Sequence, residues 1–132
     1  MKILIDTNVY IAAFISHGAC AELLEHCSRN HTLITSEYIL GECRSTLIAK
    51  FDFTHLEATQ AVQLIRTKAS IVTPASINAP ACHDPDDLPI LGSAIAGGCQ
   101  CLITGDRGLL KMKRHQTIDI ISPSDFWRYE TN

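Results

Sequence analysis

The stretch KILIDTN, residues 2–8, predicts a strand that ends at a carboxylate. Three apolar residues in a row, Ile3 to Ile5, are typical of a short strand that is covered on both faces of a sheet. The next residue is Asp6. In an open parallel α/β sheet, ligands bind at the carboxyl edge of the strands. The sequence therefore places the side chain of Asp6 where a functional site is expected.

A second stretch further along the chain repeats this arrangement. Residues 101–104, CLIT, again form a short apolar run, and the run stops at Gly105 and Asp106. If the two strands are parallel, the carboxylates of Asp6 and Asp106 lie at the same edge of the sheet.

The rest of the chain alternates between strand and helix patterns. Further strands are expected at residues 32–34, 71–73 and 118–121. Helices are expected at about residues 8–15, 19–27, 37–50, 54–70, 85–96 and 107–113, and from residue 123 onward. This alternation predicts a three-layer α/β/α fold with a parallel sheet. The length of 132 residues, without a repeat or a linker, predicts one domain over residues 1–132.

The composition indicates a folded protein with no general attraction to polyanions. Apolar residues make up 46% of the chain, which allows a sizeable core. The net charge of −3 disfavours a strong overall attraction to nucleic acid or membrane, but it permits a local basic patch. No apolar run approaches the roughly 20 residues of a membrane span, and Asp6 interrupts the pattern of a signal peptide. We expect a cytoplasmic protein without membrane contact.

The six cysteines do not have the spacing of a zinc site. The only close pair, Cys99 and Cys101, is C-x-C and lacks a second pair. We interpret the cysteines as reduced and mostly buried, with disulfides as the less favoured alternative.

Four acidic residues occupy positions that favour convergence. Asp6 and Asp106 each follow a strand. Asp87 heads the apolar face of its helix, because the residues three, four and seven positions later are apolar. Glu42 lies at the margin of the apolar stripe of another helix. These positions direct carboxylates from four segments toward one edge of the sheet.

Each acid also has a simpler explanation as a helix cap, a first-turn residue or a solvated side chain. Capping does not explain, however, why four separate segments would bring their carboxylates together. Like charges repel strongly when they are buried unless a cation lies among them. Oxygen ligands alone select hard ions, so Mg²⁺ or Mn²⁺ is the expected cofactor.

Four motifs carry a resemblance to a known family. They are DTN at 6–8, SEYILGE at 36–42, DPDDLPILGSAIAGG at 84–98 and TGDRGLL at 104–110. In this order and spacing they resemble the PIN-domain endoribonucleases, above all the toxins of VapBC-type toxin–antitoxin pairs. The chain departs from the pattern at Gly108, where many relatives carry a further acid. The resemblance therefore implies a site with four carboxylates, without the fifth that many relatives have.

The resemblance implies a five-stranded parallel sheet with the strand order 3-2-1-4-5. It also implies a Mg²⁺- or Mn²⁺-dependent endoribonuclease that hydrolyses RNA and leaves 5′-phosphate and 3′-hydroxyl ends. A cognate antitoxin protein and a homodimer are the implied partners. The implied metal-binding and catalytic residues are Asp6, Glu42, Asp87 and Asp106, with Asn8 and Thr104 as supporting hydrogen-bond residues.

A group of basic residues follows the second acidic strand end. It consists of Arg107, Lys111, Lys113 and Arg114. These side chains could hold an RNA backbone through its phosphates, despite the negative net charge. An ordinary solvated helix face and turn explains them equally well, so both interpretations stay open.

Two functions from other classes compete with the nuclease. A phosphatase could use Asp6 as its nucleophile, but such an enzyme often has a second acid two residues later, where this chain has Asn8. A non-catalytic module could keep the fold and only bind RNA or protein. The presence of all four acids argues against that loss of activity.

Overall fold

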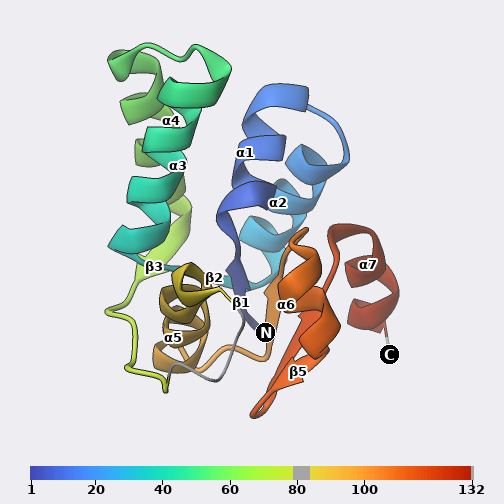
Figure 1. The fold of residues 1–132 in the computed structure, drawn as a ribbon. Coiled ribbons are helices and arrows are strands. Elements are labelled where there is room, and N and C mark those ends of the chain that lie inside the picture. The colour runs from blue at the N-terminus through green and yellow to red at the C-terminus, as the bar shows by residue number, and fades with distance from the viewer. Residues whose placement is uncertain (79–83, 132) are drawn as a thin grey trace.

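The computed structural model describes residues 1–78 and 84–131, which form a central sheet with helices on both faces (Figure 1). The sheet has the order β3-β2-β1-β4-β6-β5. Figure 1 shows the helices α5 and α6 in front of the sheet and α2 behind it. The strands are β1 (Lys2–Ile5), β2 (Thr32–Thr35), β3 (Ala69–Ile71), β4 (Cys101–Ile103), β5 (Arg114–His115) and β6 (Ile118–Ile121).

The expected α/β/α fold and the order of the parallel strands are confirmed. Strand β6 is the fifth strand that the sequence predicts, and it pairs in parallel with β4. All five predicted parallel strands are present, and the short strand β5, which was not predicted, adds a sixth that pairs antiparallel with β6. With only two residues, β5 is too short to show an alternating pattern.

The third strand lies two residues earlier than the sequence predicts, at residues 69–71 in place of 71–73. Its last paired residue is Ile71, which lies opposite Thr35 of β2. Strand β2 cannot continue past Thr35, because Ser36 caps the next helix through its side chain. Beyond Ile71, the contact with β2 ends with one hydrogen bond, from the backbone N–H of Val72 to the carbonyl of Thr35 at 2.9 Å.

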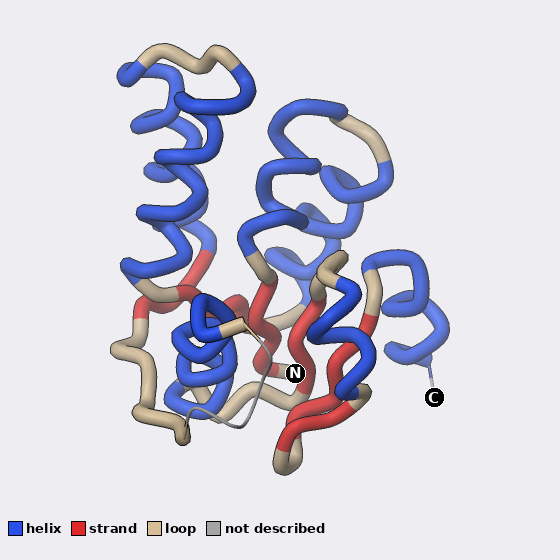
Figure 2. The backbone as a smooth tube through the Cα atoms, in the orientation of Figure 1, coloured by secondary structure: helices blue, strands red, loops and turns tan. Residues whose placement is uncertain are grey.

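The helices, which Figure 2 draws in blue, have bounds close to the predicted ranges. Thr54 and Glu57 form a reciprocal capping box at the start of the fourth helix. The predicted helix at 85–96 begins as a turn of 3-10 helix, η2 (Pro85–Asp87). The α-helices are α1 (Thr7–Ser16), α2 (Ala19–Asn30), α3 (Glu37–Phe51), α4 (His55–Lys68), α5 (Leu88–Ala96), α6 (Arg107–Met112) and α7 (Pro123–Thr131).

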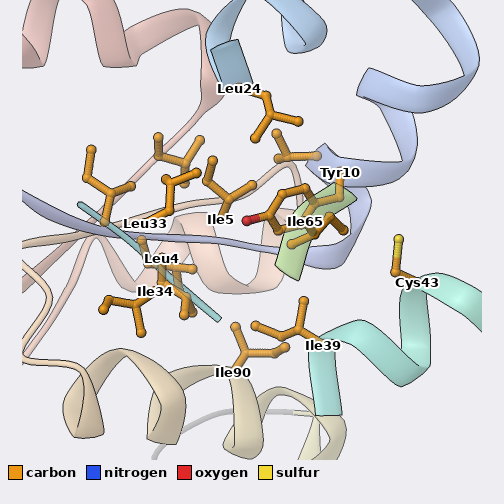
Figure 3. Close-up of a cluster of buried hydrophobic side chains, with 14 of the residues drawn as sticks. Leu4, Ile5, Tyr10, Leu24, Leu33, Ile34, Ile39, Cys43, Ile65 and Ile90 are labelled. Atoms are coloured by element: carbon orange, nitrogen blue, oxygen red, sulfur yellow. The ribbon is translucent and has the colours of Figure 1, made fainter. Parts of the chain in front are cut away.

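Strand β1 is buried on both faces, as the run of apolar residues predicts. Ile3, Leu4 and Ile5 are each 0% exposed. Figure 3 shows Leu4 on the side of Ile90 from α5, and Ile5 on the side of Tyr10 from α1. This double burial holds the end of β1 rigidly, and Asp6 follows directly.

The described cysteines are free, as expected, and most of them are buried: Cys27, Cys43, Cys99 and Cys101 are buried and Cys20 is half-buried. Cys82 lies outside the described residues. Within residues 1–78 and 84–131, none of the helices combines the length and the apolar character that crossing a bilayer requires.

Candidate metal centre

The two predicted strand-end aspartates follow neighbouring strands at the middle of the sheet. Ile5 of β1 lies opposite Ile103 of β4 in a parallel pair. The backbone N–H of Asp6 donates to the carbonyl of Ile103 at 2.9 Å, which ties the two strand ends together. Asp106 follows three residues after β4. Both carboxylates therefore lie at the carboxyl edge of the sheet.

The carboxylate of Asp6 is buried and held by three donors. Asp6 is only 5% exposed. Oδ1 accepts from the backbone N–H of Thr7 at 2.7 Å. Oδ2 accepts from the hydroxyl of Thr104 at 2.7 Å and from the amide of Asn8 at 3.2 Å. These contacts fix the direction in which Asp6 presents its remaining lone pairs.

Asn8 and Thr104, the predicted supporting residues, also connect the two strand ends. Asn8 Oδ1 accepts from the backbone N–H of Gly105 at 2.9 Å. The hydroxyl oxygen of Thr104 accepts from the backbone N–H of Asp106 at 3.0 Å. Both side chains thus contact Asp6, which follows β1, and the residues that follow β4.

Glu42 reaches the same edge from α3. Its Oε1 accepts from the hydroxyl of Thr7 at 2.8 Å, and Tyr38 donates to its Oε2 at 3.5 Å. The Tyr38 hydroxyl also lies 3.1 Å from the backbone carbonyl of Asp86. Sequence reasoning missed Thr7 and Tyr38. The spacing of four residues between Tyr38 and Glu42 is a signal that could have found the second, because side chains four apart on a helix are neighbours.

Asp87 lies at the junction of η2 and α5, and its side chain does not cap the helix. Its pKa is raised to about 7, chiefly by burial and then by the charges of Asp106, Asp84, Asp6 and Glu42 in that order. These charges act on Asp87 because their carboxylates lie nearby. The four predicted acids are therefore brought together, and we call this region, with Asp6, Glu42, Asp87 and Asp106, the acid edge.

The pKa of Asp6 is also raised by the surroundings of its carboxyl group. Burial is the largest cause, while the hydrogen bonds from Thr104 and Thr7 oppose it. The neighbouring charges of Glu42 and Asp106 add to the increase. The acid edge thus disfavours several simultaneous negative charges, which is the condition that a divalent cation relieves.

Helix capping accounts for part of the arrangement. Asp106 Oδ2 accepts from the backbone N–H of Leu109 at 2.9 Å and so caps α6. A carboxylate has further lone pairs for a metal ion, so capping and metal binding are compatible. A Cβ atom at Gly108 would lie 3.1 Å from this same oxygen, so the glycine leaves room beside the Asp106 carboxylate.

A family model described as the PIN domain matches residues 2–108. The chain belongs to the PIN-domain family. No curated protein matches the sequence of this PIN domain.

Solved structures share the fold of this PIN domain over nearly their whole length. One is VapBC2 from Rickettsia felis, in a structure bound to a DNA fragment from the VapBC2 promoter. A chain of it has a TM-score of 0.67 and 18% sequence identity, and the match covers 92% of this chain and 98% of that one. VapBC-1 from nontypeable Haemophilus influenzae has a TM-score of 0.65 and 15% identity, and the match covers 94% of this chain and 99% of that one. VapC20 from Mycobacterium tuberculosis, a sarcin–ricin loop cleaving toxin, has a TM-score of 0.63 and 16% identity, and the match covers 89% of this chain and 98% of that one. At these identities the likeness is one of fold.

The donor set at the acid edge of the PIN domain fits a hard divalent ion, because it consists of carboxylate oxygens. The four carboxylates are near enough to influence one another's charge, but they are not drawn tightly around one point. Within the described parts of the chain, they do not form a set of three whose oxygens all lie within 4.8 Å of one another. These side chains would reach an ion either by rotating toward it or through bridging water molecules, which Mg²⁺ commonly retains.

The four basic residues are spread along the PIN domain and do not gather at the acid edge. Arg107 begins α6, at the acid edge. Arg114 belongs to β5 and pairs with Asp119 of β6. Asp119 in turn pairs with Cys101, the first residue of β4, so Arg114 lies near the amino edge of the sheet. Helix α6 therefore carries the chain back toward the amino edge, with Lys111 near its end and Lys113 just after it. Of the four, Arg107 is the residue that directly adjoins the acids.

A hollow of about 400 Å³ lies beside the acid edge of the PIN domain. It is lined by residues from α1, α2 and the segments after β4 and β6, namely Asn8, Val9, Ala12, Cys20, Gly105, Asp106 and Pro123. The hollow gives a ligand access to one side of Asp106.

Asp87→Asn is expected to weaken the pH dependence of stability of the metal-free PIN domain. The pKa of Asp87 is about 7 in the folded protein against an ordinary value of 3.8. Between these values the folded state binds more protons than the unfolded state, so the free energy of unfolding falls as the pH rises from about 4 to about 7. Asparagine does not titrate, so that part of the decrease disappears.

Thermal melts in chelator at about pH 5 and about pH 8 measure this effect. Asp86→Asn, at the exposed neighbouring position, is the matched control. An Asp87→Asn protein that loses as much stability as the wild type over this range would contradict the assignment.

Proposed function

We propose that this PIN domain is a Mg²⁺- or Mn²⁺-dependent endoribonuclease that hydrolyses phosphodiester bonds of RNA. The observation that carries the proposal is the convergence of carboxylates from four segments of the chain at the acid edge. Burial raises the pKa of Asp87, and the nearby charges of the other three acids add to the increase. Such an arrangement is costly without a cation and is suited to holding one.

In this proposal each residue at the acid edge has a task. Asp6 and Asp106 hold the ion, and Glu42 and Asp87 bind a second ion, act through water or orient the attacking water. When bound, the metal lowers the pKa of water and neutralises charge on the scissile phosphate. Asn8 and Thr104 keep the Asp6 carboxylate in one orientation through their hydrogen bonds. The hollow beside Asp106 is the candidate place for a nucleotide of the RNA strand.

We also propose that the chain acts as the toxin of a toxin–antitoxin pair. The fold that it shares with VapBC2, VapBC-1 and VapC20 supports this assignment, and VapC20 is described as a toxin that cleaves the sarcin–ricin loop. A cognate antitoxin protein would inhibit the enzyme by covering the acid edge, and the active form would be a homodimer in the cytoplasm.

The proposal is tested by incubating purified protein with labelled RNA in Mg²⁺, in Mn²⁺ and in chelator. We expect internal cleavage with either metal, 5′-phosphate and 3′-hydroxyl ends, and no cleavage in chelator. Binding without cleavage would favour a non-catalytic module. Phosphorylation of Asp6 would favour a phosphatase. In such an enzyme a second acid often stands two residues later, where this chain has Asn8, and the Asn8 side chain is held by hydrogen bonds with Gly105 and Asp6.

Arg107→Ala is expected to weaken RNA binding for all sequences. The side chain is exposed and lies next to the acid edge, where it can contact a phosphate. Loss of one phosphate contact should reduce the slope of log affinity against log salt by about one unit.

Arg114→Ala is the matched control for Arg107→Ala. Arg114 is also exposed, but it pairs with Asp119 at 3.6 Å near the amino edge of the sheet. Filter binding over a range of salt concentrations compares the two variants. If Arg114→Ala lowers the slope as much as Arg107→Ala, RNA extends along all of α6. If neither changes it, the basic residues are solvated surface.

A further inference from the structure

A second group of metal-ligating side chains lies away from the acid edge. It consists of His26 on α2, His31 just before β2 and Glu130 on α7. His26 Nε2 lies 2.7 Å from Glu130 Oε2, and His31 Nε2 lies 2.5 Å from the same oxygen. In the described parts of the chain, this is the one set of three His, Cys, Asp or Glu side chains whose ligand atoms all lie within 4.8 Å of one another.

The cluster is separate from the acid edge. His31 directly precedes Thr32, which lies opposite Lys2 at the start of β1. Asp6, in contrast, follows the end of β1. The cluster therefore lies at the amino edge of the sheet, at the opposite end of β1 from Asp6.

We propose that His26, His31 and Glu130 bind a divalent transition-metal ion of the zinc class, which fastens α7 to α2 and to the start of β2. Two imidazole nitrogens and a carboxylate oxygen are a ligand set that suits Zn²⁺, whereas Mg²⁺ and Mn²⁺ prefer oxygen alone. With bonds of about 2.0–2.2 Å in a tetrahedron, ligand atoms lie about 3.3 Å apart. The two separations between Glu130 and the histidine nitrogens need to open by less than about 1 Å to admit such an ion.

The surroundings hold the three ligands in place and leave access for an ion. The side chains of His26, His31 and Glu130 are 29%, 11% and 22% exposed. The His26 ring packs against Trp127, with centroids 4.8 Å apart, and the His31 ring packs against Phe126 at 5.9 Å. Water can fill the fourth position, because the cluster is only partly buried.

Without a metal, the same three side chains form a hydrogen-bonded cluster. His31 Nδ1 lies 3.1 Å from the amino nitrogen of Met1, and His26 Nδ1 lies 3.3 Å from Nδ2 of Asn30. Both neighbours are donors, so each ring carries its hydrogen on Nε2 and donates it to Glu130. When a metal binds Nε2, the ring hydrogen moves to Nδ1. There the Asn30 amide can turn its oxygen toward the His26 ring to accept this hydrogen.

Glu130→Gln separates the metal site from the hydrogen-bonded cluster. A glutamine oxygen still accepts from both rings, but a neutral amide is a poor zinc ligand. The experiment is a calorimetric titration of Zn²⁺ into wild type and the variant, together with thermal melts. Glu22→Gln, an exposed position on the same helix as His26, is the matched control, and Asp6→Asn tests the acid edge.

We expect one Zn²⁺ per chain in wild type, Glu22→Gln and Asp6→Asn, and at least tenfold weaker binding in Glu130→Gln. Zn²⁺ should raise the melting temperature of wild type more than that of Glu130→Gln. The absence of Zn²⁺ binding by wild type, or equal affinity in Glu130→Gln, would overturn the proposal.

A second measurement on the wild-type protein covers the case in which Glu130→Gln does not fold. Nitrogen-15 spectra of the histidine rings are recorded during a Zn²⁺ titration. The ring signals of His26 and His31 should shift as Nε2 is metallated, while those of the exposed His17 and His55 stay unchanged. Unchanged signals from His26 and His31 at saturating Zn²⁺ would overturn the proposal and leave a hydrogen-bonded cluster.

Discussion

Asp6→Asn is expected to lower metal-dependent RNA cleavage by at least about a hundredfold, because metal activation of water is the main catalytic contribution in the proposed mechanism. The substitution replaces a carboxylate oxygen by an amide nitrogen and removes a negative charge. The backbone N–H of Thr7 donates to Oδ1 of Asp6 and the hydroxyl of Thr104 donates to Oδ2. In either orientation the asparagine amide would therefore place its nitrogen opposite one of these donors, and it cannot accept both hydrogen bonds as the carboxylate does. The fold should persist, because the shape of the side chain is kept.

The matched control for Asp6→Asn is Asp119→Asn. Asp119 lies on β6 near the amino edge of the sheet and accepts from the hydroxyl of Tyr129 at 2.8 Å. Initial cleavage rates in Mg²⁺, with circular dichroism to verify folding, compare the two variants with wild type. Equal rates for Asp6→Asn and wild type would remove Asp6 from the mechanism and point to a contaminating nuclease.

Asp106→Asn is expected to leave the metal-free protein at least as stable as wild type and to reduce its stabilisation by metal. In the metal-free state the Asp106 charge repels the carboxylates of Asp6 and Asp87. Asparagine caps helices about as well as aspartate does, so the hydrogen bond from Leu109 can be kept. A divalent ion binds the folded state and raises its melting temperature, and the variant has lost one of the ligands.

Thermal melts of wild type and Asp106→Asn in chelator, and in millimolar Mg²⁺ or Mn²⁺, measure both effects. If the acids only capped helices, loss of the charge would cost about 0.3–1 kcal/mol and metal would have no effect. A wild-type protein without a metal-dependent shift, together with a less stable variant in chelator, would favour that explanation.

The sequence predicts the acid edge well because local patterns determine it. A run of apolar residues that stops at an acid locates the end of a strand, and the parallel fold then brings Asp6 and Asp106 to one edge. Helical periodicity places Asp87 on the side of its helix that faces the sheet. The family resemblance adds Glu42, which periodicity places only at the margin of its stripe.

Features that depend on the path of the chain in space could not be predicted in this way. Arg107 and Arg114 are close in sequence, yet α6 and β5 carry them toward opposite edges of the sheet. The cluster of His26, His31 and Glu130 joins α2 and α7, whose contact is long-range and has no spacing pattern. Strand β5 exists because it pairs with β6, and two residues alone carry no periodic signal.

The most direct test of the account is a titration of Mn²⁺ followed by electron paramagnetic resonance, which reports the concentration of free ion. Mn²⁺ prefers oxygen ligands, so it should bind the acid edge and not the histidine cluster. We expect wild type and Glu130→Gln to deplete free Mn²⁺ equally, and Asp6→Asn and Asp106→Asn to bind it at least tenfold more weakly. Equal Mn²⁺ binding by all four proteins, or none by wild type, would contradict the claim that the four carboxylates form a metal centre.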